Sequence, residues 1–420
     1  MMNWVAVVIL LTLIASFFLD LIADILNIRG LRKELPDEFE DVYDPDRYRR
    51  SQEYLKATTR FGWAAGAVDL AALLVFWFAG GFAILDEWVR SFGWGPVASG
   101  LVFMGVLLLL KALLSLPLSV YSTFVIEERF GFNKTTPKTF VLDRIKGLAL
   151  SLVLGAPLLA AILAFFEYAG GYAWLWCWLI AAIYLLTVQF IAPRWIMPIF
   201  NKFEPLEEGE LRSSIMDYAD KVDFSLQNVY VMDGSKRSAK SNAFFTGFGK
   251  NKRIALFDTL IDRHTVRELT AVLAHEIGHY KKNHIVQGMI IGILHMGVMF
   301  FLLSLFLSYE PLFAAFYIDT PSVYAGLIFF GLLFAPIDLF LGILLQMRSR
   351  KNEYQADRFA VRTTRDPQSM ISALKKLAAD NLSNLTPHPF YVVLHYSHPP
   401  MPARVKAIRA VGKPLEGKPN

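Results

Sequence analysis

Charged residues and cysteines are scarce in this chain. Asp, Glu, Lys and Arg together make up only 19% of its 420 residues, whereas an average soluble domain contains about 25%. Hydrophobic residues reach 55%, which is more than a soluble core can bury, so much of this apolar surface must face lipid. The same composition excludes a disordered, collagen-like or coiled-coil protein. Cys177 is the single cysteine, so the chain cannot form an internal disulfide.

Seven stretches are long and apolar enough to cross a bilayer, which takes about 20 residues. They cover approximately residues 4–26, 62–85, 97–124, 147–167, 171–193, 287–309 and 322–347. No Lys or Arg precedes Arg29, so the first stretch lacks the basic start of a cleavable signal peptide and is expected to remain as a helix. The predicted fold class is therefore mainly α, with a bundle of seven transmembrane helices.

Polar residues divide the chain into four parts. Residues 1–193 contain the first five spans with their loops, 194–286 form a polar segment, 287–347 contain spans six and seven, and 348–420 form a polar tail. Eight Lys and Arg lie between the first two spans, one (Arg90) between the second and third, and five between the third and fourth. By the positive-inside rule, this alternation predicts an N-terminus outside and both polar segments in the cytosol.

Several ionisable side chains lie inside the predicted spans, chiefly Asp69, Lys111, His295 and Asp338, and Asp20 and Asp24 lie near the end of the first. Such groups are costly in lipid and usually face the interior of a helix bundle or water. Two interpretations stay open, because the groups either line a hydrated chamber or are isolated and paired locally. The two halves of the chain do not mirror each other, which disfavours a transporter built from inverted repeats.

The segment His275-Glu276-Ile277-Gly278-His279 has the spacing of a metal site on a helix. Residues four apart share a helix face, so the two imidazoles can bind one zinc ion, and Glu276 lies beside the metal, where it can take a proton from water. Zinc lowers the pKa of a bound water to about 7. Gly278 is a poor helix former, costing about 1 kcal/mol, but it permits another backbone to pack closely. The alternative is a helix that merely contains two histidines.

A catalytic zinc ion usually has three protein ligands and one open position for water. His284 is near in sequence, but at 100° per residue it points away from the ligand face, and we expect a partly exposed histidine at a helix end. Glu353 is the better third ligand, because antiparallel spans six and seven would bring it to the surface that carries His279. Asp357 is placed to accept the free N–H of a zinc-binding histidine. Taken alone, this second segment would be an ordinary charged helix end.

Two further segments can complete such a site. Residues 229–232, 242–245 and 254–257 have strand-like composition. An edge strand beside a metal helix can bind peptide by strand addition, with Asn242 and Ala243 as the contacts, although a purely structural hairpin is the alternative. Near the C-terminus, His398 and Arg404 flank a proline-containing loop. Near a metal they could stabilise an oxyanion, and otherwise they are ordinary loop residues.

Several of these motifs together resemble the signature set of the type I CAAX prenyl proteases, which are integral-membrane zinc metallopeptidases with a gluzincin-like catalytic domain. The matching stretches are 127–134, 198–203, 241–247, 275–279, 352–357 and 397–404. The resemblance implies that the seven helices enclose a water-filled chamber, closed on the cytosolic side by the catalytic domain and its small β-sheet. It is specific, since the motifs are long and occur in order over residues 100–410.

The resemblance also implies roles for single residues. His275, His279 and Glu353 would bind zinc, and Glu276 would act as general base and then as proton donor to the leaving amine. The remaining roles fall on residues around this centre: Asn242 would bind the substrate backbone, His398 would help to hold the oxyanion, and Arg404 would pair with Asp357.

The function that we predict is hydrolysis of peptide bonds near the C-terminus of substrates, as in proteases that remove the last three residues of isoprenylated CAAX proteins. The expected partners are a peptide or protein, with or without a prenyl group, and the lipid bilayer, but no nucleic acid. Short loops and a tail without a dilysine signal favour a bacterial inner membrane over the endoplasmic reticulum, and hence a quality-control protease without a prenyl requirement. Alternatives from other classes are a metal-handling transporter and a catalytically inactive binding protein.

Overall fold

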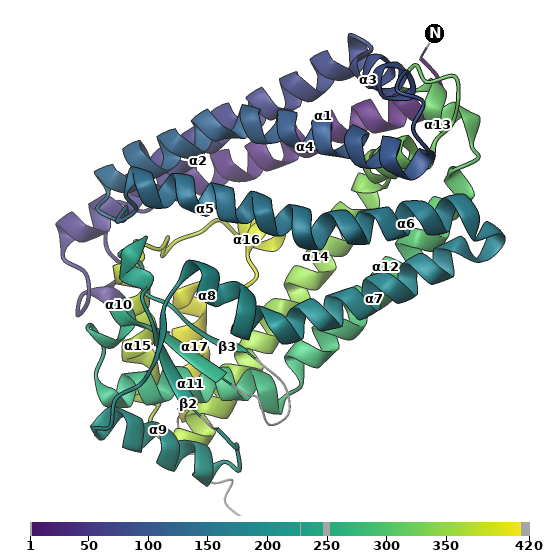
Figure 1. Ribbon diagram of the computed structural model, residues 1–420. Coiled ribbons are helices and arrows are strands. Elements are labelled where there is room, and N and C mark those ends of the chain that lie inside the picture. Colours follow the sequence, from purple (N-terminus) through teal and green to yellow (C-terminus); the bar gives the residue numbers. More distant parts are fainter. Residues whose placement is uncertain (1, 227, 247–252, 413–420) are drawn as a thin grey trace, which may run out of the picture.

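The computed structural model describes residues 2–226, 228–246 and 253–412. As predicted, seven helical units in this described part are long and apolar enough to cross a membrane. They are α1 (Trp4–Arg29), α2 (Pro45–Phe78), α4 (Pro96–Tyr121) with the π-helical turn Ser122–Glu127, α5 (Pro137–Leu150) continued by α6 (Ala156–Tyr168), α7 (Ala173–Ile191), α12 (His284–Phe306) and α14 (Val323–Thr364). Figure 1 shows these long helices with the small sheet at one end, away from the N-terminus.

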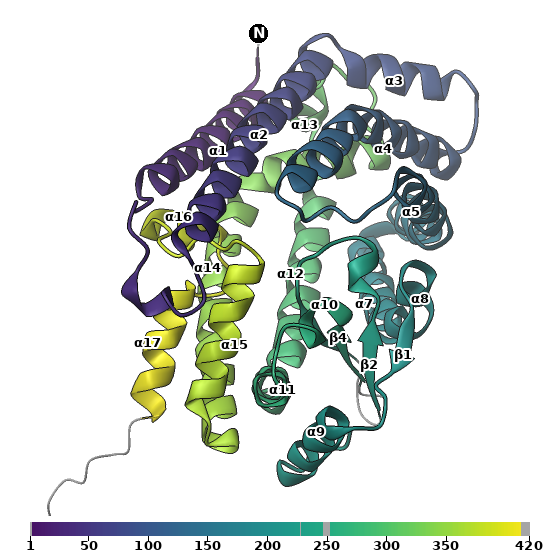
Figure 2. The same ribbon diagram turned by 90° about the vertical axis from the view of Figure 1, so that its left-hand side faces the viewer.

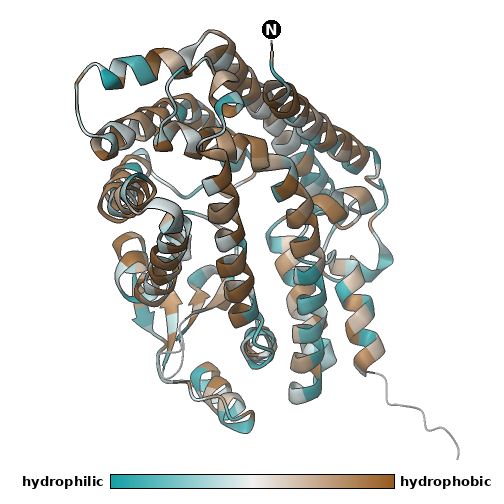
Figure 3. Ribbon diagram, turned by 90° about the vertical axis from the view of Figure 1, so that its right-hand side faces the viewer, coloured by the Kyte–Doolittle hydropathy of each residue, from teal (hydrophilic) through white to brown (hydrophobic). Residues whose placement is uncertain are grey.

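Large apolar side chains on these helices point outward. Leu108, Val153 and Ile290 are each more than half exposed, at 67%, 68% and 53%. Exposed apolar surface on this scale is not tolerated in water, so these faces are the ones that contact lipid. Figure 3 shows hydrophobic residues along the long helices and many hydrophilic residues at the end that carries the sheet.

The second span differs from the prediction. The stretch 62–85 was expected to be one helix, but α2 ends at Phe78 and a separate helix, α3 (Gly81–Arg90), follows. Gly80 lies between them with φ 75°, a left-handed conformation that glycine adopts without a steric penalty. The chain therefore turns inside the apolar run, and Phe82 packs edge-on against Phe76 instead of continuing the span.

The ionisable groups inside the spans form pairs between helices. Lys111 Nζ lies 2.5 Å from Asp69 Oδ1, which joins α4 to α2, and His295 Nε2 lies 3.1 Å from Asp338 Oδ1, which joins α12 to α14. All four side chains are partly exposed. Local pairing therefore accounts for their presence within apolar helices.

The polar segments form a helical domain around a small mixed sheet. Its strands are β1 (Phe203–Pro205), β2 (Asn228–Met232), β3 (Ala243–Thr246) and β4 (Arg253–Phe257), in the order β1-β2-β4-β3. β2 and β4 are parallel, and the other two pairings are antiparallel. The three predicted strands are confirmed to within one residue, whereas β1 was not predicted because it is only three residues long.

Helix α11 (Val266–Lys281) crosses this domain, and its residues Leu269, Leu273 and Ile277 pack into the same fully buried core as Ile254 and Leu256 of β4. The remaining helices are α8 (Met197–Phe200), α9 (Glu210–Lys221), α10 (Asp258–Ile261), α13 (Glu310–Ala314), α15 (Pro367–Asp380), α16 (Pro389–His395) and α17 (Met401–Gly412). Figure 2 shows the sheet below α5 and beside α11, so the core of this domain lies outside the bundle of apolar helices.

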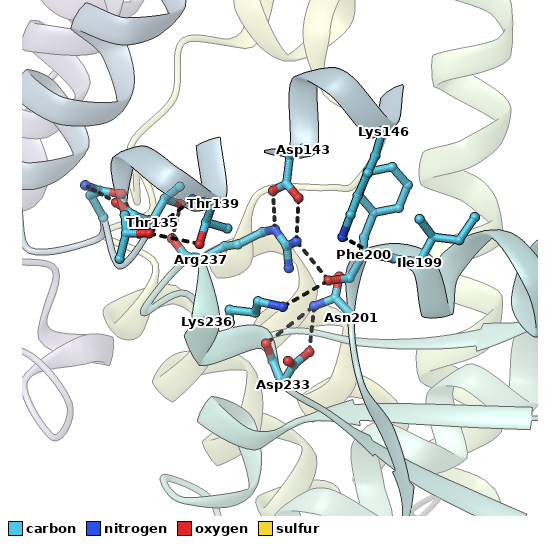
Figure 4. A network of polar contacts seen from close by, with 12 residues as sticks. Thr135, Thr139, Asp143, Lys146, Ile199, Phe200, Asn201, Asp233, Lys236 and Arg237 are labelled. Atoms are coloured by element: carbon cyan, nitrogen blue, oxygen red, sulfur yellow. Dashed lines mark hydrogen bonds and ion pairs between the residues drawn. The ribbon is translucent and has the colours of Figure 1, made fainter. Parts of the chain in front are cut away.

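A polar network fastens membrane helix α5 to the sheet domain (Figure 4). Arg237 donates two hydrogen bonds to the carboxylate of Asp143 on α5, at 2.7 and 2.8 Å, and a third to the carbonyl of Phe200 at 2.8 Å. Asn201 Nδ2 donates to Asp233 Oδ1 at 3.0 Å. Bidentate pairing between arginine and a carboxylate fixes direction as well as distance, so the sheet has a defined orientation against α5.

Candidate metal centre

The helix that carries the histidine motif begins with a capping box. The side chain of Thr265 accepts a hydrogen bond from the backbone N–H of Glu268, and the Glu268 carboxylate accepts one from the backbone N–H of Thr265. Glu268 is fixed further by the Ser372 hydroxyl and by Lys376, whose Nζ lies 2.8 Å from its Oε2. The apolar face of α11 is buried in the sheet domain, and His275 and His279 lie one turn apart on another side.

His275, His279 and Glu353 come together as three possible metal ligands. The two histidine Nε2 atoms are 3.1 Å apart, and they lie 3.5 and 3.3 Å from the carboxylate oxygens of Glu353. A tetrahedral zinc ion with ligand distances of about 2.1 Å holds its ligand atoms about 3.4 Å from one another. The donors are two imidazole nitrogens and one carboxylate, whose Oε2 faces His275 and whose Oε1 faces His279, at separations close to those that zinc requires. These residues therefore fit the predicted ion.

Gly278 explains how Glu353 reaches the histidine helix. A Cβ atom at Gly278 would lie 3.1 Å from both the Cα and the carbonyl oxygen of Ala356 on α14. The backbones of α11 and α14 are therefore in direct contact, as expected for a glycine in a crowded site. Helix α14 does not end near residue 347, where the predicted span stops, but continues to Thr364. Glu353 and Asp357 are consequently presented on a rigid extension of a membrane helix.

Asp357 and Arg404 form a buried pair behind His275. Asp357 Oδ1 lies 2.9 Å from His275 Nδ1, and Arg404 donates two hydrogen bonds to Asp357, at 2.9 and 2.5 Å. Burial alone would lower the pKa of His275, but the hydrogen bonds to Asp357 and Glu353 outweigh it and raise that pKa to about 9. The bond at Nδ1 leaves His275 Nε2 directed towards the other two ligand atoms.

Two further predicted residues lie at the open side of the cluster. The His398 side chain is 62% exposed, and its Nδ1 lies 2.9 Å from Glu353 Oε2. Glu276 is half-buried and makes no hydrogen bond or ion pair with the residues that the structure describes. Its carboxylate is therefore available to a bound molecule. Arg404 is close enough for its positive charge to interact with Glu276.

His284 lies at a helix end and outside the ligand group, as expected, but the expectation that it is partly exposed and points away was wrong. This histidine is buried, its Nδ1 lies 3.1 Å from His279 Nδ1, and its Nε2 lies 3.1 Å from the Gln355 side-chain oxygen. Helix α11 stops at Lys281, and Asn283 adopts a left-handed conformation with φ 56°. The chain turns there, so counting 100° per residue beyond the end of α11 gives the wrong direction. His284 supports His279 much as Asp357 supports His275.

Strand β3 forms one edge of the sheet, next to α11. The Asn242 carbonyl accepts a hydrogen bond from Phe257 N–H at 3.1 Å and so points towards β4. Since successive residues of a strand direct their backbone groups to opposite sides, Ala243 presents its backbone N–H and C=O to the open edge. The exposed Asn242 side chain accepts a hydrogen bond from that same Ala243 N–H at 2.9 Å. The two predicted contact residues therefore lie at a free strand edge.

Comparison with known proteins agrees with this geometry. Residues 24–202 match the family model described as CAAX prenyl protease N-terminal, five membrane helices, and residues 205–411 match that of peptidase family M48. The chain is 37% identical to CAAX prenyl protease 1 of Saccharomyces cerevisiae over 90% of its own length and 89% of the relative's. It is 34% identical to the Homo sapiens homolog over the same shares of the two chains.

A solved structure shares the whole architecture. The crystal structure of S. mikatae Ste24p has a TM-score of 0.91 and 34% identity to this chain, and the match covers 97% of this chain and 100% of the other. The predicted fold and the predicted protease activity are confirmed, and the transporter and inactive-binding alternatives are not favoured. The chain thus belongs to the CAAX prenyl protease family, the integral-membrane metallopeptidases of peptidase family M48.

Proposed function

We propose that this membrane metalloprotease works with one zinc ion held by His275, His279 and Glu353. The observation that carries the proposal is the closeness of the three donor groups. The two histidine Nε2 atoms are 3.1 Å apart, His275 Nε2 lies 3.5 Å from Glu353 Oε2, and His279 Nε2 lies 3.3 Å from Glu353 Oε1. Glu353 Oε2 is also buried without a well-directed hydrogen bond, although His398 Nδ1 and Arg404 Nη1 lie 2.9 and 3.3 Å away. A buried carboxylate oxygen in this state is suited to a cation. Zinc would supply Lewis acidity there, lowering the pKa of a water molecule and polarising the scissile carbonyl.

Glu276 is the proposed general base. It lies on α11 between the two histidines, and among the described residues no side chain neutralises it by direct contact. Its carboxylate takes a proton from the attacking water and then delivers that proton to the nitrogen of the leaving amine. One group can do both, because the base is protonated by the first step at the moment when the second step needs an acid.

We propose that His398 and Arg404 favour the negative charge that forms on the scissile carbonyl oxygen, His398 by a hydrogen bond and Arg404 by its positive charge. His398 is largely exposed beside Glu353, so as an imidazolium it can donate its second ring N–H to a substrate oxygen. Arg404 is buried and held by Asp357. Its proposed role is therefore to fix Asp357, and through it the orientation of His275, while its charge favours an anion forming nearby.

Substrate peptides are proposed to pair with the free edge of β3. Ala243 offers one backbone donor and one acceptor there, and Asn242 offers an exposed side-chain amide that can exchange its bond with Ala243 for bonds to the substrate. Strand addition recognises the backbone of an extended peptide rather than its side chains. It therefore holds substrates of varied sequence in one direction across the metal centre.

The proposed substrates are proteins or peptides cleaved near their C-terminus. The names of the relatives point to CAAX proteins carrying a prenyl group, and the seven apolar helices give such a group a lipid environment. We propose that these helices surround a hydrated chamber that leads to the metal centre, and that nucleic acid plays no part. Quality-control cleavage without a prenyl requirement is the second candidate, because strand addition reads only the peptide backbone.

The orientation of the chain in the membrane stays a prediction from the positive-inside rule. The catalytic domain should face the cytosol, in a bacterial inner membrane rather than the endoplasmic reticulum. Single cysteines placed at Arg90 and at exposed Lys406, in a Cys177→Ser background, should react with an impermeant thiol reagent from opposite sides. Labelling of both positions from one side would contradict this topology.

The central experiment compares wild type with Glu276→Gln on two peptides that differ only in a farnesyl group on the cysteine. Glu276→Gln should retain its zinc but lose activity by about 10²- to 10⁴-fold, the range for a missing general base. Glu207→Gln, an exposed change away from the site, should have no effect. Cleavage by Glu276→Gln at the wild-type rate would refute the mechanism, and equal cleavage of both peptides would favour the quality-control role.

A further inference from the structure

The segment just before the substrate-pairing strand runs along the cytosolic ends of the membrane helices. Lys134 N–H donates to the Arg237 carbonyl at 3.0 Å, and Ala239 N–H donates to the Phe132 carbonyl, also at 3.0 Å. Asn133 and Ser238 form an antiparallel bridge between these two bonds. The loop that follows the third span is thus paired, backbone to backbone, with residues 237–239.

Two cations of this segment are bound by membrane helices. Arg237 makes the bidentate pair with Asp143 of α5 (Figure 4). Three residues later, Lys240 Nζ lies 3.0 Å from Glu127 Oε2, at the end of the third span, and donates to the Tyr54 hydroxyl of α2 at 2.8 Å.

The Lys240 ammonium group also lies between aromatic rings, 4.6 Å from the ring centre of Phe132 and 5.1 Å from that of Tyr54. Cation–π attraction adds to the ion pair and restricts where the ammonium can sit. Lys240 therefore has one position, and that position is set by the third and second spans together.

The next residue, Ser241, is held from the opposite side. Its backbone N–H donates to the Asn381 side chain at 3.1 Å, and its carbonyl accepts from the same amide at 3.2 Å. Its hydroxyl donates to the Thr259 carbonyl, and the Thr259 hydroxyl donates back to the Lys240 carbonyl. The peptide group between Lys240 and Ser241 is thus fixed at both its donor and its acceptor, and the next one, which leads into Asn242, is fixed at its acceptor.

The strand itself is weakly held by comparison. β3 has four residues and, among the residues that the structure describes, pairs only with β4. Its other edge has to stay unpaired if a substrate is to occupy it, so no neighbouring strand can set its position on that side. A short strand bonded on one edge is marginal on its own, and its register relative to α11 must come from the residues that precede it.

We propose that Lys240 and Arg237 are positioning residues, which use the ends of α2, α4 and α5 to hold the substrate-pairing edge of β3 in register with the metal centre. The inference rests on the proposed function, because it assumes that β3 binds the peptide. Neither side chain needs to touch substrate. Loss of the Lys240 anchor leaves the fold and metal ligands intact but lets the edge shift, so peptide binds less well.

The test is a set of variants assayed for KM, kcat, zinc content and Tm. Lys240→Met and Glu127→Gln should each raise KM by about tenfold with a kcat near wild type, as expected when binding is lost equally in the ground and transition states. The double variant should be no worse than either single change, since both remove one interaction. Lys240→Arg should restore most of the affinity, and the exposed Lys236→Met should behave as wild type.

A second series separates positioning from general stability. Peptides methylated at one backbone nitrogen near the scissile bond lose their pairing with β3, so wild type should discriminate against them. In Lys240→Met this discrimination should shrink, because the pairing is already impaired. If wild type cleaves normally but Lys240→Met has an unchanged KM and unchanged discrimination, this inference alone would be overturned. Failure of wild type to cleave any peptide would overturn the proposed function as well.

Discussion

Replacing Gly278 by alanine would place a methyl group between the two helices that form the metal centre. The added Cβ would lie 3.1 Å from the Cα and the carbonyl oxygen of Ala356 and 3.2 Å from Phe359 Cδ1. Comfortable carbon contacts are about 3.5–4.0 Å. The two Ala356 atoms belong to the backbone and cannot rotate away. Helices α11 and α14 must therefore separate by about 0.5 Å.

The change should affect the stability of the fold only slightly but should weaken zinc binding. Overpacking costs about 1–3 kcal/mol, while alanine regains about 1 kcal/mol of helix propensity over glycine. The free energy of unfolding should therefore fall by about 2 kcal/mol at most. Glu353 lies one turn before Ala356 on α14, so the shift moves it away from His275 and His279. Metal sites tolerate about 0.2 Å in ligand distance, and we expect zinc affinity to fall by about 10- to 100-fold.

The assay is competition for zinc with a chromophoric chelator, with Tm measured on the metal-free protein in detergent. Gly292→Ala is the matched control, because it makes the same change within membrane helix α12, where nothing lies within 4 Å of the new Cβ. It should leave zinc affinity unchanged. Wild-type zinc affinity in Gly278→Ala would show that the spacing of the two helices does not govern the site, and the reasoning would fail.

Three further predictions concern the surroundings of the centre. Asp357→Asn should reduce zinc affinity by about 10- to 100-fold, measured by the same competition, because His275 loses its carboxylate partner. Chelation should abolish cleavage, and added zinc should restore it, whereas activity that survives full removal of the metal would contradict the assignment. Burial would raise the pKa of Glu268, but its bonds to Lys376 and Ser372 outweigh this and lower it. Its stabilisation is therefore present above the ordinary pKa of a glutamate and is lost as the pH falls through the lowered value. Glu268→Gln should reduce stability by roughly 1–2 kcal/mol at pH 7, and the difference in Tm should close in acid.

The sequence was informative wherever a local rule decides the structure. Helical spacing places His275 and His279 on one face, and the order of the spans brings Glu353 to the same end of the molecule. Both are consequences of chain direction and of the 3.6-residue turn, so the separation of these residues in sequence did not matter. The glycine at 278 likewise predicted a close approach, although it did not identify α14 as the partner.

Two of the misses, the end of the second span and the direction of His284, share one physical cause, which is a single residue in a left-handed conformation. Gly80 ends a helix inside an apolar run, and Asn283 redirects the chain between α11 and α12. Neither change alters the hydrophobic pattern from which spans and faces were predicted. Asparagine is among the few residues other than glycine that adopt this conformation readily, so Asn283 followed by His284 was the available signal that the ligand helix had ended.

The turn at Asn283 also has a consequence for the metal centre. It brings His284 back against His279, with the two Nδ1 atoms 3.1 Å apart. The Gln355 side-chain oxygen, 3.1 Å from His284 Nε2, can only accept, so in neutral His284 the proton is on Nε2 and Nδ1 is the acceptor. His279 then donates from its Nδ1, which leaves its Nε2 lone pair directed towards Glu353. Asp357 does the same for His275 from α14. Both imidazoles are thus oriented before any ion arrives, one by the start of the sixth span and the other by the extension of the seventh.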